Sequence, residues 1–300
     1  MRILITGAAG QIGGALVGLK DQKVFKGIEI VGFKKDSLDI TRIEMIDNAL
    51  NMIHPNLIVN AAAYTSVDTA EQVPEQAFLI NRDGPAYLAA ACAKRHIWLV
   101  HISTNYVFNG KATQPYCPSN TVSPLSVYGA SKEAGENAVR NALANHIILR
   151  TAWVYDAYGD NFMNTMLRIA KERTEVRVIA DQYGTPTTAI DVAFTIMAIV
   201  HAQINHTHFA PGTYHYTNEG KTTWYGFAQA IFDRAEKFCW RRPKIQPITT
   251  LDYLTPAKRP LYSVLKTSPE IDVLPNVPNR SWQLALDEVF TERMGNKGDF

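Results

Sequence analysis

The first half of the chain alternates short apolar runs with segments in which apolar residues recur at helical spacing. The apolar runs are rich in Ile, Val and Leu, which is typical of strands buried on both faces. They predict strands at Ile3–Thr6, Ile28–Phe33, Leu57–Asn60 and Leu99–Ser103, and the periodic segments predict helices at Gln11–Leu19, Ile43–Ile53, Glu75–Lys94 and Val127–Ala144. This βαβαβαβα order indicates an α/β protein with a Rossmann-type, doubly wound parallel sheet.

The pattern becomes irregular after Arg150. It predicts helices at Asn161–Glu172, Ile190–Ala202, Thr223–Lys237 and Trp282–Phe290, strands at Val176–Ala180 and Thr213–Thr217, and a proline-rich stretch of loops from Arg242 to Pro278. We therefore expect two domains. Residues 1–150 form a dinucleotide-binding domain, to which segments around residues 175–205 return, and residues 151–300 form mainly a smaller, mixed α/β substrate-binding domain.

Composition narrows the class of protein. The 300 residues are 46% apolar and 19% charged, with 30 Lys and Arg against 28 Asp and Glu. This is the composition of a soluble globular protein, and a net charge of +2 gives no broad field to gather phosphate backbones. We expect no nucleic-acid partner, and any anion site must be local.

Cysteine usage and apolar segments bear on the compartment. Cys92, Cys117 and Cys239 lie far apart and form no CxxC or CxxH pair, which favours a reducing compartment. The first residues run directly into an apolar strand without the pattern of a signal peptide. The apolar window Val192–Val200 is much shorter than the roughly 20 residues that span a bilayer. We expect a cytoplasmic protein with no membrane partner.

A glycine-rich turn, Gly7-Ala-Ala-Gly10-Gln-Ile-Gly13, follows the first predicted strand and opens the first helix. Glycines there permit a tight turn and let the backbone approach a pyrophosphate, which the free N–H groups of the helix N-terminus attract. The same glycine spacing also occurs in ordinary turns, so the evidence for a binding site is its position between a strand and a helix. The turn predicts a dinucleotide site.

Two lysines follow the second predicted strand, where NAD-binding proteins usually carry a carboxylate for the ribose hydroxyls. Lys34 and Lys35 could pair with the 2′-phosphate of NADP, or they could be solvated loop lysines. The first alternative predicts NADPH as the cofactor, with NADH possible.

A tyrosine and a lysine, Tyr128 and Lys132, lie four residues apart, so that a helix presents both on one face. They lie about 25 residues beyond the predicted strand that ends near Ser103 and Thr104, and the carboxyl edge of the sheet would bring these groups together. An ammonium near a phenol lowers the phenol's pKa. Tyr128 would then donate a proton to an oxyanion, while Thr104, or failing that Ser103, would hold the substrate carbonyl.

The glycine turn and the Tyr-x-x-x-Lys pair resemble the extended short-chain dehydrogenase/reductase family. Further segments resemble one group within it, the dTDP-4-dehydrorhamnose reductases, and the resemblance runs from residue 1 to about residue 290. These segments include Asn60-Ala-Ala-Ala-Tyr64-Thr65, His101-Ile-Ser-Thr-Asn-Tyr-Val-Phe108, Arg150-Thr-Ala-Trp-Val-Tyr155, Gln182-Tyr-Gly-Thr-Pro-Thr187 and Thr223-Trp-Tyr225.

The resemblance implies roles for particular residues. The glycine turn, with Gly7, Gly10, Gln11, Ile12 and Gly13, would cradle the cofactor, and Asp39 and Ile40 would border its adenine. Its middle section would be lined by Ala62, Ala63 and Tyr64. Tyr128 and Lys132 would hold its nicotinamide ribose. The sugar would contact Thr104, Asn105, Tyr106, Trp153 and Asn161, and Arg259 would meet the substrate diphosphate because a guanidinium matches phosphate geometry. Tyr106 and Trp153 could instead be aromatic core residues.

The chain departs from the resembled group at two positions. Asn105 replaces a common aspartate, which bears on specificity if that carboxylate touches substrate. Ala15 stands where some relatives carry a glutamate of a metal-linked dimer contact, so no metal is expected. A homodimer remains an expectation of the resemblance.

Three functions follow as alternatives. The first is NADPH-dependent reduction of the 4-keto group of dTDP-4-dehydrorhamnose, in nucleotide-sugar and cell-surface polysaccharide biosynthesis. The second is reduction of another nucleotide 4-ketosugar. The third is a non-catalytic NADP-binding subunit that resembles the regulatory subunit of methionine adenosyltransferase, which the intact Tyr128 and Lys132 disfavour.

Overall fold

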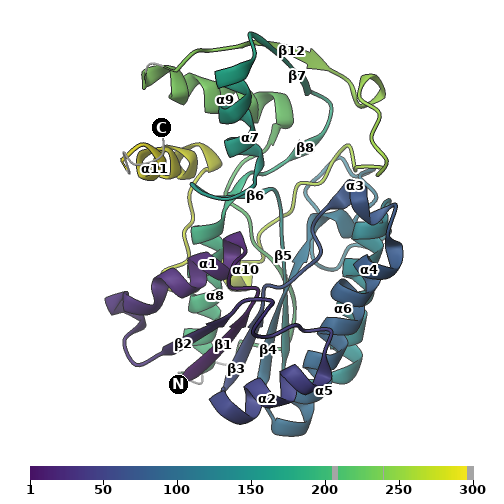
Figure 1. The fold of residues 1–300 in the computed structure, drawn as a ribbon, viewed down its shortest axis with the longest axis vertical. Coiled ribbons are helices and arrows are strands. Elements are labelled where there is room, and N and C mark those ends of the chain that lie inside the picture. Colours follow the sequence, from purple (N-terminus) through teal and green to yellow (C-terminus); the bar gives the residue numbers. More distant parts are fainter. Residues whose placement is uncertain (205–208, 239, 296–300) are drawn as a thin grey trace.

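A six-stranded parallel sheet forms the centre of the computed structural model, which describes residues 1–204, 209–238 and 240–295. The strand order is β10-β5-β4-β3-β1-β2. The chain therefore winds from β1 outward in both directions, which is the predicted doubly wound arrangement (Figure 1). The strands are β1 (Arg2–Thr6), β2 (Glu29–Phe33), β3 (Leu57–Asn60), β4 (Trp98–Thr104), β5 (His146–Thr151) and β10 (Gly212–His215).

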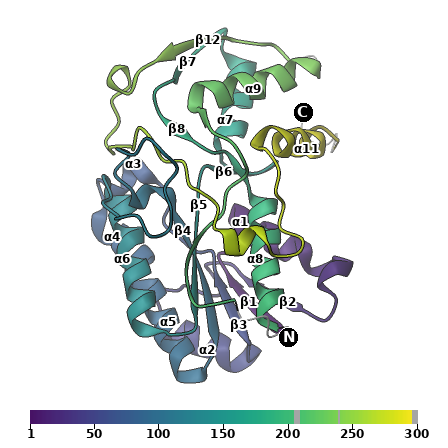
Figure 2. The same cartoon turned by 180° about the vertical axis from the view of Figure 1, so that it is seen from behind.

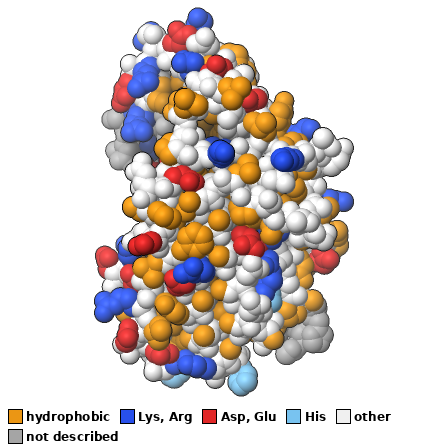
Figure 3. Space-filling view, turned by 90° about the vertical axis from the view of Figure 1, so that its right-hand side faces the viewer, with side chains coloured by type: hydrophobic (Ala, Val, Ile, Leu, Met, Phe, Trp, Pro, Cys, Tyr) orange, Lys and Arg blue, Asp and Glu red, His pale blue; other side chains and the backbone are white. Residues whose placement is uncertain are grey.

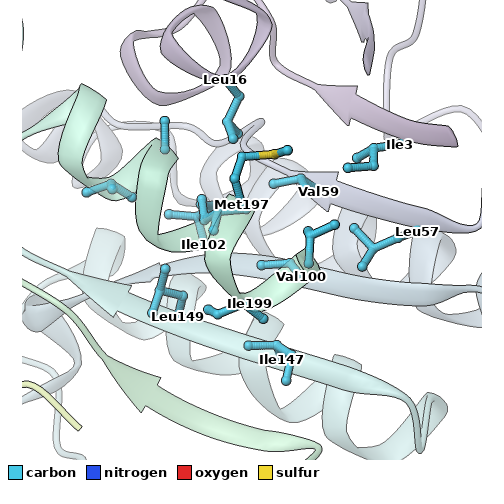
Figure 4. Packing of buried hydrophobic residues seen from close by; sticks show 14 of the residues in the cluster. Ile3, Leu16, Leu57, Val59, Val100, Ile102, Ile147, Leu149, Met197 and Ile199 are labelled. Atoms are coloured by element: carbon cyan, nitrogen blue, oxygen red, sulfur yellow. The ribbon is translucent and has the colours of Figure 1, made fainter. Parts of the chain in front are cut away.

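Helices cover both faces of this sheet, because successive strand residues point to opposite sides. Ile3 and Ile5 face Leu16 and Met197, which come from α1 (Gln11–Gly18) and α8 (Ala189–Ile204), as Figure 4 shows for part of this layer. Leu4 faces the opposite layer. That layer is formed by α2 (Ile43–Ile53), α5 (Gly84–Arg95) and α6 (Val127–Ala142).

Another apolar cluster is formed by elements that lie beyond the carboxyl ends of the strands (Figures 1 and 2). Phe227, Leu167 and Phe290 are buried in it and come from three different helices. Its elements are α7 (Phe162–Glu172), β7 (Glu175–Ile179), α9 (Trp224–Lys237), β12 (Lys244–Ile248) and α11 (Trp282–Gly295). We call these elements the upper unit.

Short elements connect the sheet and the upper unit. Pairs of two-residue strands form between β6 (Val154–Tyr155) and β9 (Thr187–Thr188), and between β8 (Tyr183–Gly184) and β11 (Thr222–Thr223). The helices α3 (Val67–Ala70), α4 (Pro74–Phe78) and α10 (Pro269–Asp272) are one turn each.

The sequence prediction missed strand β5, although it lies in the interior of the sheet between β4 and β10. Its apolar run is only three residues long and ends at a charged residue, Arg150. Arg150 is nevertheless buried, because Glu136 of α6 accepts two hydrogen bonds from its guanidinium. A buried ion pair of this kind cannot be read from the apolar pattern of one strand.

The long helix predicted at Glu75–Lys94 is divided into three parts. Between α4 and α5 lies a π-helical turn, η3 (Leu79–Asp83), which turns the side chain of Asn81 inward. The proline-rich stretch also contains strand β12, which was predicted as loop. The other predicted bounds agree with the structure to within one or two residues, except that α11 continues to Gly295.

Two segments of the second half lie against the central sheet. Helix α8 packs on the face that carries α1, and β10 pairs with β5. Strand β7, which falls in the same expected range of residues 175–205, pairs instead with β12 in the upper unit.

Two further features concern membranes and surface charge. No helix among the described residues is long and apolar enough to cross a membrane. On the face shown in Figure 3, basic and acidic side chains are interspersed, as the small net charge suggests.

Candidate active site

A cavity of about 570 Å³ opens at the carboxyl edge of the central sheet. Its walls come from the glycine turn, the ends of β3, β4 and β5, the first turns of α6 and the first residue of α9. Several lining residues were not predicted: Thr65, Val67, Thr151, Asp160 and Trp224. Thr65, Thr151 and Trp224 lie within motifs that the sequence singled out, whereas nothing in the sequence marked Val67 and Asp160.

The glycine turn is closely packed against the end of β3. Gly7 has a φ of +67°, and a Cβ there would lie 2.6 Å from the backbone nitrogen of Ala62. A Cβ on Gly13 would lie 2.2 Å from the carbonyl oxygen of Gly7. Helix α1 then begins after Gly10, which has no side chain to occupy the helix N-terminus. A turn with bare backbone and a helix N-terminus at the cavity edge fits a dinucleotide pyrophosphate.

The structure brings Thr104, Tyr128 and Lys132 together in this cavity. The hydroxyls of Thr104 and Tyr128 are hydrogen-bonded to each other. The Nζ of Lys132 donates a hydrogen bond of 2.6 Å to the carbonyl oxygen of Ile102 on β4. Two hydroxyls, of Thr104 and Tyr128, and the ammonium of Lys132 therefore line the same part of the cavity at the edge of the sheet.

The prediction that Lys132 lowers the pKa of Tyr128 is wrong for this structure. Burial raises the pKa of Tyr128 to about 12, although the bond with Thr104 partly opposes the rise. The ammonium of Lys132 is directed at the backbone of β4. Tyr128 therefore keeps its proton at neutral pH, which is the form that a proton donor needs.

The same burial acts on Lys132 in the opposite sense. It lowers the pKa of the Lys132 ammonium to about 8, while the negative charge of Glu136 works against this decrease. Lys132 is still mostly protonated at neutral pH, but it begins to lose its charge in mildly alkaline solution.

The side chain of Asn105 is hydrogen-bonded to the side chain of Thr104. The hydroxyl of Thr104 donates to Oδ1 of Asn105 at 3.2 Å, and Nδ2 of Asn105 donates to the carbonyl oxygen of Ser263, also at 3.2 Å. Because a carboxylate has no proton to give, the second bond requires the amide. Asn105 borders the cavity but lies almost fully buried.

Two predicted aromatic residues line the cavity. The ring of Tyr106 meets Tyr128 edge-on, with centroids 5.9 Å apart, and its hydroxyl is hydrogen-bonded with Arg259. Trp153 has a φ of +47° and stacks on Trp224. Both rings are therefore part of the wall and of the packing beneath it.

Two other predicted contacts lie outside the residues that line the cavity. Asn161 caps helix α7, because its Oδ1 accepts a bond from the backbone N–H of Asn164, and its Nδ2 donates to Oε1 of Gln11 at 3.2 Å. Arg259 forms two bonds of 2.9 and 2.6 Å with the carboxylate of Asp68, whose pKa it lowers. Both side chains are thus engaged within the protein.

The remaining residues that were predicted to bind the cofactor follow β2 and β3. Lys34 and Lys35 are exposed directly after β2. Asp39 accepts two bonds from Thr41, which lower its pKa against the opposing effect of burial, and Ile40 is buried in the layer of α2 and α5.

The segment after β3 is fixed by side chains from neighbouring elements. Ala63 lines the cavity, whereas the backbone N–H of Ala62 bonds to Oδ1 of Asn60. The backbone of Tyr64 both donates to and accepts from the Asn81 amide of the π-helical turn. The π-helical turn that interrupts the predicted helix therefore places the Asn81 amide where it binds the backbone of Tyr64.

A metal centre is not visible in the described parts of the chain, where no three His, Cys, Asp or Glu side chains gather closely enough to hold an ion. Ala15 lies partly buried on α1 against the apolar layer of the sheet.

Comparisons with known proteins identify the family of this chain. The family described as RmlD substrate binding domain matches residues 1–294. The dTDP-4-dehydrorhamnose reductase of Aggregatibacter actinomycetemcomitans is 40% identical over 291 residues, which cover 96% of this chain and 98% of the relative.

Two solved structures are also similar. One is a dTDP-4-dehydrorhamnose reductase from Clostridium acetobutylicum, with a TM-score of 0.88 and 36% identity over 98% of this chain and 100% of that one. The other, from Bacillus anthracis in complex with NADP, has the same score and identity over 97% and 99% of the two chains. With near-complete coverage on both sides, this chain belongs to the RmlD substrate binding domain family, the family of the dTDP-4-dehydrorhamnose reductases.

Proposed function

We propose that this protein catalyses the NADPH-dependent reduction of the 4-keto group of dTDP-4-dehydrorhamnose to dTDP-L-rhamnose, in the cytoplasm, as a step of nucleotide-sugar and cell-surface polysaccharide biosynthesis. The observation that carries the proposal is the meeting of Thr104, Tyr128 and Lys132 in a cavity that the glycine turn also lines. The names of the relatives support the choice of substrate.

The residues present fit the cofactor. Gly7, Gly10 and Gly13 leave bare backbone at the start of α1, where Gln11 and Ile12 border the cavity. Lys34 and Lys35 would pair with the 2′-phosphate, and Asp39, Ile40, Ala62, Ala63 and Tyr64 would flank the rest of the dinucleotide. NADPH, when bound, supplies the hydride.

Each catalytic side chain has one task in the proposed reduction. Thr104 orients the ketone oxygen by a hydrogen bond. As carbon 4 gains the hydride, Tyr128 donates its phenolic proton to the developing alkoxide, and the tyrosine later recovers a proton from solvent. Lys132, as an ammonium, would bind the nicotinamide ribose together with Tyr128.

The substrate contacts follow from the cavity walls. Tyr106, Trp153 and Trp224 offer aromatic surface to the sugar nucleotide. Asn105 would act through Thr104, and Asn161 through Gln11. Arg259 would reach the diphosphate only by exchanging its bonds with Asp68 for bonds to phosphate.

The test is oxidation of NADPH by the purified protein with and without the dTDP-keto sugar, followed by identification of the sugar product. Consumption that depends on this substrate and yields dTDP-rhamnose supports the proposal. Turnover only with another nucleotide 4-ketosugar would change the substrate, and NADPH binding without any turnover would point to a regulatory subunit. The same assay in the presence of a chelator tests the expectation that no metal is needed.

A further inference from the structure

A buried carboxylate lies behind the catalytic residues, and the proposed chemistry does not use it. Glu136 has no exposed surface and lies one helical turn after Lys132 on α6. Tyr128, Lys132 and Glu136 follow one another at intervals of four residues, so they share one face of the helix. A carboxylate is costly to bury unless it is fully paired.

The partners of Glu136 join three elements. Its Oε1 accepts bonds from Nε of Arg150 at 2.8 Å and from Oγ of Ser103 at 2.6 Å. Its Oε2 accepts bonds of 2.6 Å from Arg150 and from Arg140. Ser103 and Arg150 also lie opposite each other in the β4–β5 register, so one carboxylate fastens α6 to the ends of both strands.

We propose that Glu136 is a positioning residue, which holds the end of β4 with Thr104 in register with Tyr128 and Lys132 and supplies the negative charge that keeps Lys132 an ammonium. Ser103 directly precedes Thr104, so the Ser103–Glu136 bond ties the residue that orients the carbonyl to the helix that carries the proton donor. The catalytic part of this inference rests on the proposed reduction, in which Lys132 acts as a cation.

The charges around Lys132 support the second role of Glu136, which is to keep Lys132 protonated. Burial lowers the pKa of Lys132, and in the described part of the chain Glu136 is the charged group that opposes this decrease. His101 on β4 is neutral, because burial and the nearby cations hold its pKa well below the usual range. Arg140 and Arg150 both bind Glu136.

Among the described residues, the other groups that face Lys132 add no carboxylate. Tyr128 of the same helix keeps its proton, because burial raises its pKa. The π-helical turn that packs on α6 contributes the uncharged amide of Asn81, which bonds to Ser131. Loss of the charge on Glu136 should therefore leave Lys132 with a lower pKa.

The test compares Glu136→Gln with Glu133→Gln, a matched change on the same helix whose glutamate bonds only to Asn137 among the described contacts. The protonation of Lys132 is followed by NMR of lysine labelled with ¹³C at Cε, with the signal assigned from Lys132→Arg. We expect the Lys132 midpoint to fall by about one pH unit in Glu136→Gln and to stay in place in Glu133→Gln. The alkaline side of the pH profile of kcat should shift in the same direction as the Lys132 midpoint. Equal midpoints in both variants would overturn the electrostatic role.

A second variant tests the positioning role and keeps every charge, so that it remains informative if Glu136→Gln does not fold. Ser103→Ala should lower kcat by about threefold to tenfold, with an unchanged Lys132 midpoint and an unchanged Kd for NADPH. An unchanged kcat would overturn the positioning role. Absence of turnover by the wild type would count against the proposed function alone, because the NMR titration needs no substrate.

Discussion

The indole rings of Trp153 and Trp224 are stacked, with centroids 3.5 Å apart and planes 9° from parallel. Trp153 follows β5 of the central sheet, whereas Trp224 is the first residue of α9 in the upper unit. Phe162 of α7 packs on the same indole of Trp224, at 4.6 Å between centroids. The stack therefore joins the sheet to the upper unit at the wall of the cavity.

Removal of one ring of this stack should affect substrate more than cofactor. We expect Trp224→Ala to raise the KM for the dTDP-keto sugar about tenfold, because the substrate loses an aromatic wall and Trp153 loses its support. The Kd for NADPH should stay within about twofold. Steady-state kinetics and fluorescence titration measure the two constants. Trp240→Ala, in which a ring against Lys171 is removed, is the control, and an equal rise in KM there would contradict the assignment.

Gly184 gives a stability prediction at the same place. A Cβ on this residue would lie 2.3 Å from Cε2 of Trp153, within a ring held by the stack. We expect Gly184→Ala to lower the free energy of unfolding by about 1–3 kcal/mol, as overpacking usually does. Gly18→Ala places its Cβ in open space and serves as the control. Denaturant unfolding of both variants decides the matter, and equal stabilities would show that Trp153 moves aside at little cost.

Tyr128→Phe keeps the aromatic ring and removes the hydroxyl, which is the proposed proton donor and the partner of Thr104. General acid catalysis typically contributes about 10²–10⁴-fold, so we expect kcat to fall by roughly that factor while NADPH binding is retained. The measurement is steady-state kinetics with the dTDP-keto sugar. Near-normal turnover would remove Tyr128 from the mechanism.

The choice of cofactor is tested at Lys34 and Lys35. If these exposed lysines pair with the 2′-phosphate, the double change to alanine should weaken NADPH binding about tenfold or more and leave NADH binding unchanged. Titration with each cofactor gives the two Kd values. The same double change at Lys23 and Lys26, which begin and follow a 3₁₀ turn before β2, controls for the loss of net charge. Unchanged NADPH affinity would leave Lys34 and Lys35 as solvated loop lysines.

Lys132→Met should separate activity from stability. Turnover and NADPH affinity should both fall, because Lys132 is assigned to the nicotinamide ribose, which sets the place of the nicotinamide beside Tyr128. Burial depresses the pKa of Lys132 to about 8, so below that pH the folded protein carries a costly buried ammonium. This cost fades as the pH rises from about 8 toward the ordinary lysine pKa, where the unfolded chain binds the extra proton.

The stability of the wild type should therefore rise through this alkaline window, and at neutral pH Lys132→Met should be more stable by up to about 3 kcal/mol. Tm measured between pH 6 and pH 10 tests both statements. A variant that is less stable at every pH would show that the Lys132 bond to Ile102 outweighs the cost of burying the charge.

The sequence alone was sufficient for the class of fold and for the meeting of the three residues that we propose as catalytic in one cavity. Strands such as Leu57–Asn60 and helices such as Ile43–Ile53 are local, and their apolar spacing is set by which face they bury. Thr104, Tyr128 and Lys132 were predictable as a group because a parallel sheet collects the ends of its strands at one edge.

Only the tertiary structure decided how these groups are supported and charged. The apolar pattern missed β5 because Arg150 is neutralised by Glu136 from another element, and the π-helical turn at Asn81 forms because that amide bonds to the distant backbone of Tyr64. The pKa of Tyr128 depends on burial, which spacing along a helix does not reveal. Arg259 matches phosphate in its chemistry, but folding places it against Asp68. Residue types and local periods are properties of the sequence, whereas burial and partners far along the chain exist only after folding.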